Sequence, residues 1–175
     1  FHDSNAWQSK GRQGDTDVAT QLDGSTLAAR GTILIKKDIT AVIDVLLRRF
    51  PERKIWDENI KEMYVTDEKF PYYRDSYSRV STGIFGVSDR DLVVRSLARM
   101  IPDGPEAGGF QAVAWGLAPE DMGPQDQQHK NAAKGAVRAG YSGGWLIYPR
   151  NDGKHTEVTS YISSNPGGSI PQWVS

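Results

Sequence analysis

A single amphipathic helix, in a chain otherwise made of short strand-like runs, is the feature that most constrains the fold. Apolar residues recur at helical spacing from Ile39 to Phe50 and form one stripe. Asp38 is positioned to cap the first turn, and Pro51 ends the helix. A helix with one apolar stripe must bury that stripe against another element, so we expect this helix to lie on a sheet.

The rest of the chain predicts that sheet, because β-rich runs alternate with turn residues along most of its length. Asp152 and Gly153 form a strong hairpin signal between the last two runs. The pattern indicates an α+β protein with one antiparallel sheet, in a single domain over residues 1–175. The expected strands are 25–35, 63–66, 72–80, 92–100, 110–115, 136–139, 145–148 and 155–163.

Composition and charge exclude several classes of function. The formal net charge of -1 argues against a nucleic-acid partner, since binding the phosphate backbone needs a basic excess. There is no cysteine, which excludes disulfides and thiolate metal sites, and no apolar run approaches the roughly 20 residues that span a bilayer. His155 and Glu157 share a strand face without a third ligand, and an exposed polar face is the favoured interpretation. We therefore expect no metal and no cofactor.

Four segments resemble the START (StAR-related lipid-transfer) family, in the right order and at about the right spacing. Residues 54–62 read K-I-W-D-E-N-I-K-E, and residues 87–93 read V-S-D-R-D-L-V. Residues 135–139 read G-A-V-R-A, and residues 165–173 read N-P-G-G-S-I-P-Q-W. One such motif alone would be a weak signal, whereas four in order indicate the family.

The resemblance implies a helix-grip fold, in which a curved antiparallel sheet encloses a lipid cavity and holds a long C-terminal helix. Ser169 and Pro171 are suited to begin that helix, but the chain stops at Ser175. We therefore expect the helix to be missing or truncated: either it is cut away or disordered, or a neighbouring chain supplies it, as in a swapped homodimer. We also expect Trp56 to be buried, and Arg90 with Asp91 to satisfy backbone groups near a strand start.

In function, the resemblance implies non-catalytic binding of a lipid and its transfer between membranes, with transient contact to a membrane surface. Many sterol-binding members carry a charged pair, for which the corresponding positions here are Tyr77 and Ser96, so a phospholipid is favoured over a sterol. The alternatives are a lipid-sensing regulatory domain of a larger protein and a helix-grip enzyme of the cyclase or hydrolase type. The sequence does not fix the compartment, and a cytoplasmic protein peripheral at membranes is favoured.

Strand alternation, registered on Arg90 and Asp91, selects the residues expected to line the cavity. For each of them, ordinary sheet core is an equally good interpretation. Residues 117–134 form a long loop that we expect to gate entry, with Met122 and Pro124 touching the membrane, and a disordered insertion is the alternative. The lining candidates are Tyr73, Tyr77, Leu92, Val94, Ser96, Val113, Trp115, Arg138, Trp145, Ile147, Val158, Ser160 and Ile162.

Overall fold

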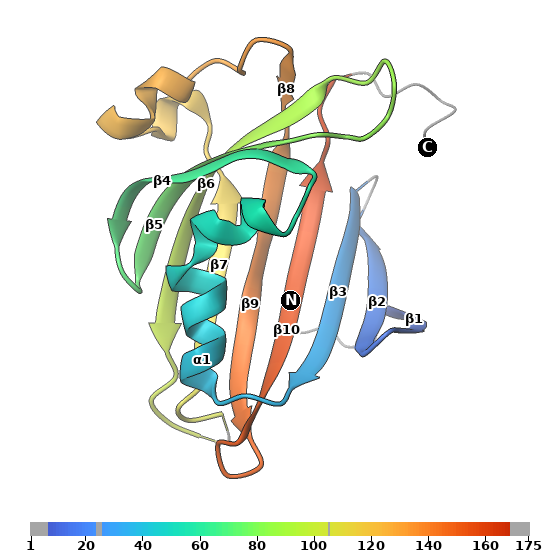
Figure 1. Ribbon diagram of the computed structural model, residues 1–175, viewed down its shortest axis with the longest axis vertical. Coiled ribbons are helices and arrows are strands. Elements are labelled where there is room, and N and C mark those ends of the chain that lie inside the picture. Colours follow the sequence, from blue (N-terminus) through green and yellow to red (C-terminus); the bar gives the residue numbers. More distant parts are fainter. Residues whose placement is uncertain (1–6, 24–25, 105, 169–175) are drawn as a thin grey trace.

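In a computed structural model that describes residues 7–23, 26–104 and 106–168, the chain forms a ten-stranded sheet (Figure 1). Nine strands follow the order β1-β2-β3-β10-β9-β7-β6-β5-β4, and neighbours along this path are antiparallel. Strand β8 lies off the path and runs parallel to the start of β6. The strands are β1 (Gln8–Gln13), β2 (Thr16–Asp23), β3 (Thr26–Ile35), β4 (Ile60–Lys69), β5 (Tyr73–Val80), β6 (Asp89–Met100), β7 (Phe110–Gly116), β8 (Ala136–Arg138), β9 (Gly140–Arg150) and β10 (His155–Asn165).

The helix predicted after β3 begins where the sequence indicates. The Asp38 carboxylate accepts a hydrogen bond from the Ala41 N–H at 3.0 Å, which satisfies a backbone donor that the first turn leaves unpaired. The α-helical turns of α1 (Ile39–Ile43) continue into the wider turns of η2 (Asp44–Arg48). A 3₁₀ segment, η3 (Phe50–Ile55), follows with Pro51 in its first turn and leads into β4.

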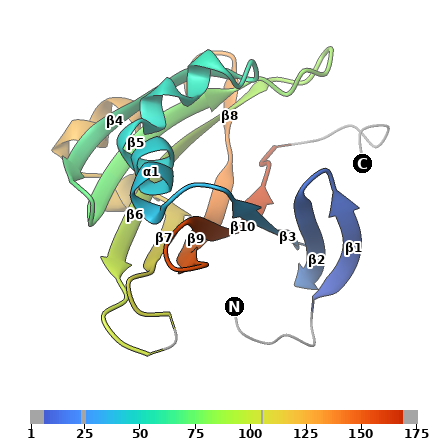
Figure 2. The ribbon, with the colours of Figure 1, turned by 60° about the horizontal axis from the view of Figure 1, so that its bottom comes forward.

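The strand register divides the sheet into two faces. Ile33, Val158, Ile147 and Phe110 occupy one row across β3, β10, β9 and β7, and they pack against Val42 of α1. We call this side the helix face and the opposite side the outer face. Figure 2 shows the sheet curving around α1.

The core lies where α1 meets this row. Phe110 and Ile147 are fully buried, and Val42 and Val158 are nearly so. Ile43, Leu46 and other apolar residues pack around them. Each fully buried side chain of this size contributes about 1.5–3 kcal/mol relative to an exposed one, so this contact holds α1 on the sheet.

Three of the segments that carry the resemblance are joined by ion pairs at the start of β6. The Nζ atom of Lys61 lies 2.9 Å from both carboxylate oxygens of Asp89. The guanidinium of Arg138 donates from Nε to the buried Asp91 carboxylate at 2.9 Å. These contacts fix β4 and β8 to β6.

The fourth segment closes on the same place. The Arg90 guanidinium donates to the carbonyl oxygens of Ser88 and Pro166, as expected for a residue that satisfies backbone groups. The four resembling segments are thus far apart in sequence and meet in space. We call these residues the β6 clamp: Lys61, Asp89, Arg90, Asp91, Arg138 and Pro166.

Some expectations from sequence are wrong or lie outside the described residues. Trp56 is 66 % exposed rather than buried, because it follows η3 at the surface, where the Arg53 guanidinium lies over its ring at 5.7 Å. The β1–β2 hairpin was not expected, since β1 is polar and fully exposed. The predicted start of a C-terminal helix at Ser169 falls outside the residues that the structure describes. None of the described helices is long and apolar enough to cross a membrane.

Candidate ligand-binding face of the sheet

Helix α1 covers only part of the helix face. It packs on the row of Phe110 and Ile147, in front of the lower part of the sheet in Figure 1. Two rows further along the same face, the cross-strand partners Ser96, Ala114 and Gly143 form a row of small residues. Beyond the end of α1, the helix face therefore has a floor of small side chains.

Larger apolar and aromatic side chains border this floor. Trp145 pairs with Ala112 and Ser160 and makes contact with the core cluster beneath α1. Ile162, the partner of Gly143 on β10, is 45 % exposed. An apolar border around a floor of small residues matches the construction of many ligand pockets.

Tyr141 belongs to this face and was not predicted from sequence. A β-carbon placed at Gly143 would lie 2.8 Å from the Tyr141 hydroxyl and 2.4 Å from the carbonyl oxygen of Tyr161, so only glycine fits beneath the Tyr141 ring. Burial raises the pKa of the Tyr141 phenol, and the charge of Arg53 opposes that rise. A neutral phenol therefore lies over the floor and is able to donate or accept a hydrogen bond.

The structure brings eight of the thirteen lining candidates together on the helix face. Their positions follow from the cross-strand pairs of β5, β6, β7, β9 and β10. Ile147 and Val158 lie beneath α1 as ordinary core, and the other six lie nearer the uncovered part. The eight are Leu92, Val94, Ser96, Trp145, Ile147, Val158, Ser160 and Ile162.

The other five candidates lie on the outer face: Tyr73, Tyr77, Val113, Trp115 and Arg138. The reason is register. Tyr77 pairs with Val93 rather than with Leu92 or Val94, and Val113 pairs with Gly144 rather than with Trp145. A slip of one residue moves a whole strand to the opposite face, and alternation within each strand does not fix the pairing between strands.

A charged pair does exist in this part of the sheet, but on the outer face. The Arg95 guanidinium donates two hydrogen bonds to the buried Asp75 carboxylate, at 2.9 and 2.7 Å. Burial opposes ionisation of Asp75, but the hydrogen bonds from Arg95 and Tyr73 outweigh it and lower the pKa of that carboxyl. Arg95 therefore lies on the face opposite Ser96, and the sequence alone did not identify Asp75 as its partner.

The long loop also lies on the outer face. Met122 is 6 % exposed and packs with Leu117 against Tyr77 and Val93. Two 3₁₀ turns, η4 (Pro119–Asp121) and η5 (Pro124–His129), give the loop its own local structure. In this arrangement Met122 is not available to a membrane, whereas Pro124 is exposed. The loop does not border the floor of small residues.

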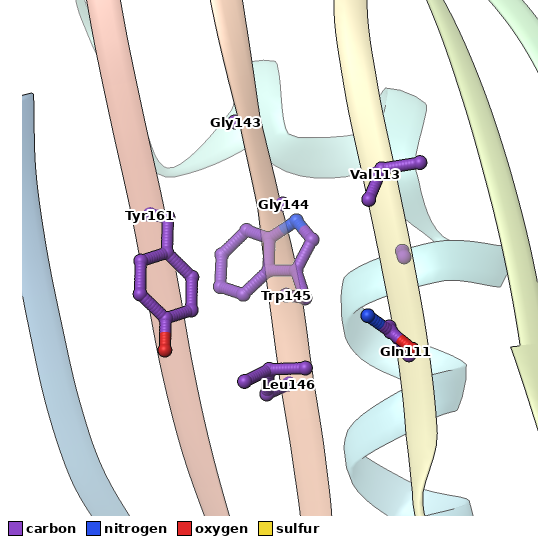
Figure 3. Close-up of a pocket in the computed structure, with 8 residues that line it drawn as sticks. Gln111, Val113, Gly143, Gly144, Trp145, Leu146 and Tyr161 are labelled. Carbon is purple, nitrogen blue, oxygen red and sulfur yellow. The ribbon is translucent and has the colours of Figure 1, made fainter. Parts of the chain in front are cut away.

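Figure 3 shows a hollow on the outer face, with α1 behind the strands. It lies above Gly144, between its cross-strand partners Tyr161 and Val113, with Gln111 and Leu146 beside it. It is open to solvent, and the space of about 370 Å³ that it spans includes part of that solvent. The hollow exists because Gly144 lacks a side chain, and it is separated from the helix face by the sheet itself.

In the described residues, neither face gathers a set of side chains suited to holding a metal ion. No group of three or more His, Cys, Asp or Glu side chains converges there. Glu157 accepts a hydrogen bond from Arg150 at 3.0 Å, and the His155 ring contacts the Asn151 amide. On the helix face, the Arg74 guanidinium bonds to Glu68 and to the carbonyl oxygen of Leu47.

Comparison with known proteins identifies the fold. No family model and no curated protein sequence matches the chain. Human STARD10 superposes with a TM-score of 0.77 at 18% identity, over 99% of this chain and 66% of that one. A STAR-related lipid transfer protein from Xanthomonas axonopodis gives a TM-score of 0.76 at 22% identity, over 97% and 87%. Human StAR-related lipid transfer protein 5 gives 0.78 at 18% identity, over 99% and 78%.

The chain has the START fold. The fold class predicted from the four sequence segments, a helix-grip architecture with a curved antiparallel sheet, is thereby confirmed. The chain spans 66% of the length of the human STARD10 chain, so it corresponds to only part of that protein. The identities to these structures are only 18–22%, so the likeness lies in the fold.

Proposed function

We propose that this START-fold chain binds a lipid on the uncovered part of the helix face and carries it between membranes without catalysing a reaction. The observation that supports this most is the floor formed by Ser96, Ala114 and Gly143, bordered by Trp145 and Ile162. Burying each methylene of an acyl chain there contributes about 0.8 kcal/mol, so a chain of ten would contribute about 8 kcal/mol. The START-fold proteins of similar structure include two that are named as lipid transfer proteins.

We favour a phospholipid over a sterol as cargo. The helix face presents hydroxyl groups and the Tyr141 phenol near the floor, while the Asp75–Arg95 pair lies on the opposite face. Arg74, the charged partner of Ser96 across the strands, is engaged by Glu68 and by the backbone. Hydroxyl groups without a fixed charge suit a polar head group that lies at the mouth of the site.

Transient membrane contact is also part of the proposal, through a different surface from the one expected. Ile55, Trp56 and Phe85 are 76 %, 66 % and 99 % exposed, whereas Met122 is buried. Arg53 and Lys54 of η3 directly precede Ile55 and Trp56 in the chain, whereas Phe85 lies in the loop between β5 and β6. Aromatic rings beside basic residues are typical of surfaces that rest at a lipid–water interface. The proposed swapped dimer concerns residues outside the described part of the chain.

Two neighbouring substitutions test the site. Ala114→Trp adds a large ring to the floor on the helix face, and Val113→Trp adds the same ring one residue away on the outer face. Native mass spectrometry of the purified proteins should find lipid on the wild type and on Val113→Trp, and much less on Ala114→Trp. Transfer of fluorescent phospholipid between vesicles should fall in the same order.

The opposite outcomes are equally informative. Loss of lipid in Val113→Trp alone would move the ligand to the outer face and refute the proposed site. A wild-type protein that never carries lipid, or that turns over a small substrate, would replace the carrier function by a sensor or an enzyme.

A further inference from the structure

The β7–β8 loop, residues 117–135, is held on the outer face by apolar packing, by ring stacking and by a buried carboxyl group, besides hydrogen bonds such as that between the Tyr64 hydroxyl and His129 Nε2 at 2.7 Å. Leu117 and Met122 pack on Tyr77 and Val93. The His129 ring stacks on the Tyr77 ring, with centroids 4.1 Å apart and planes at 17°. These contacts leave a third anchor, a carboxyl group, at the centre of the buried surface.

That carboxyl belongs to Asp126, which is 0 % exposed. Neither oxygen of the ionised Asp126 carboxylate receives a hydrogen bond. The nearby Thr66 hydroxyl is also buried and has no hydrogen-bond partner. The Asp126 carboxyl lies close to the Asp75 carboxyl and to the Thr66 hydroxyl, without a hydrogen bond to that hydroxyl. A buried carboxylate without donors is costly, because it loses its hydration without compensation.

Asp75 is the member of this carboxyl pair that remains ionised. Its carboxylate already receives two hydrogen bonds from Arg95 and one from the Tyr73 hydroxyl. Two adjacent buried carboxyl groups do not both ionise readily, since like charges repel strongly where water is excluded. A proton on Asp126 converts the contact between the two acceptors into a hydrogen bond from Asp126 to Asp75.

We propose that Asp75 and Asp126 share one proton when the β7–β8 loop is docked, so that docking of the loop takes up a proton from solution. The contact joins the loop to β5, and through Arg95 to β6, and within the described residues the Asp126 carboxyl has no other hydrogen-bond partner. Ionisation of Asp126 therefore favours release of the loop. Release would expose the apolar surface of Tyr77, Val93 and Met122.

The sign of the pH dependence follows from Asp126. Burial is the largest effect and raises the pKa of Asp126, the Thr66 hydroxyl opposes that rise, and the neighbouring Asp75 adds to it. In the released loop this carboxyl would have the pKa of an exposed aspartate, about 3.9. Docking therefore weakens as pH rises above that value, by up to about tenfold per pH unit, and the change levels off above the docked pKa.

His129 responds to pH in the opposite direction. Burial lowers the pKa of the His129 imidazole, so docking weakens on acidification below about 6.5, where the ring of a released loop gains a proton. Any measurement must separate the two groups. The charged and titratable groups that face the pair or His129 are Glu62 and Tyr64 on β4, Tyr73, Asp75 and Tyr77 on β5, Asp91 and Arg95 on β6, and Arg138 on β8.

Amide hydrogen exchange over residues 119–131, corrected for the intrinsic effect of pH, tests the proposal between pH 4.5 and 8. In Asp126→Asn the side-chain amide donates a hydrogen bond to Asp75 at every pH. Opening of the loop in this variant should therefore not increase with pH as it does when Asp126 ionises. The ratio of wild-type to Asp126→Asn opening should increase with pH, because the contribution of His129 cancels. Asp121→Asn, an exposed aspartate of the same loop, should behave as the wild type.

A ratio of wild-type to Asp126→Asn opening that stays constant between pH 4.5 and 8 would overturn the proposal. An equal increase in the ratio of wild-type to Asp121→Asn opening would also overturn it. Should Asp126→Asn fail to fold, the titration of the Asp126 carboxyl carbon in the wild type, followed by NMR, decides the question. A midpoint clearly above that of Asp121 supports the shared proton, and a midpoint at or below that of Asp121 excludes it.

Discussion

Replacing Asp91 by alanine should destabilise the protein more than any surface substitution, because Asp91 is the buried centre of the β6 clamp. Its carboxylate is fully buried and accepts hydrogen bonds from Arg138 Nε at 2.9 Å and from the Ala133 N–H at 2.8 Å. The substitution leaves that N–H unpaired, at a cost of about 1–3 kcal/mol. It also leaves Arg138 without its counter-ion.

The loss at Arg138 is limited by its environment. Removing one partner of a fully buried ion pair costs about 3–5 kcal/mol, but the Arg138 side chain is 25% exposed and keeps a hydrogen bond to the carbonyl oxygen of His129. We therefore expect a total of about 3 kcal/mol for Asp91→Ala. In a domain of this size that corresponds to a fall in Tm of about 6–12 °C.

Urea and thermal unfolding would measure this difference, with Asp103→Ala as the control at an exposed position. A double-mutant cycle with Arg138→Met isolates the pair, and its coupling energy should exceed about 1 kcal/mol. A loss below about 1 kcal/mol in Asp91→Ala, or additivity in the cycle, would refute the reasoning.

Further substitutions probe other parts of the molecule. Phe110→Ala should cost about 3–5 kcal/mol in urea unfolding, since the ring is fully buried beneath α1, and a smaller loss would mean that α1 closes over the space. Gly143→Ala should lower Tm by several degrees, because its β-carbon would meet the carbonyl oxygen of Tyr161; an unchanged Tm would contradict that close approach. The wild-type protein should lose stability on acidification below about pH 4, and Asp75→Asn should lose less. The reason is that the pKa of Asp75 is lower in the folded than in the unfolded protein. The ionised Asp75 therefore adds stability above the unfolded pKa of about 3.9, and this stability disappears as the pH falls through the folded pKa. Trp56→Ser should weaken sedimentation with anionic vesicles, with Tyr72→Ser, also exposed, as the comparison.

Local signals in the sequence predicted the elements well. Asp38 caps α1 as expected, and the turn at Asp152 and Gly153 joins β9 to β10 with both residues at positive φ. These signals act within a few residues, so the sequence alone carries them. By contrast β1 was missed, because its exposed polar residues are held in place by pairing with β2 rather than by an apolar pattern.

The candidate site was predicted only in part, for a different reason. Ser96 and Trp145 were assigned correctly to one face, but Tyr77 and Val113 were assigned to the same face although the register places them on the other. Register depends on turns and bulges, such as the shifts in β4, that one sequence does not reveal. The contact of Asp126 with Asp75 was likewise beyond reach, since it joins a loop to a strand about 50 residues away in the chain.

The β6 clamp has a consequence for how the protein acquires its structure during synthesis. Its contacts join residues 28, 47 and 76 positions apart, and the last of them, from Arg90 to Pro166, requires almost the whole described chain. A nascent polypeptide that has not yet released Pro166 from the ribosome cannot complete this arrangement, so β6 must wait with its first residues unsecured. Such long-range closure slows folding, and we expect the growing chain to be most prone to aggregation until translation has passed β10.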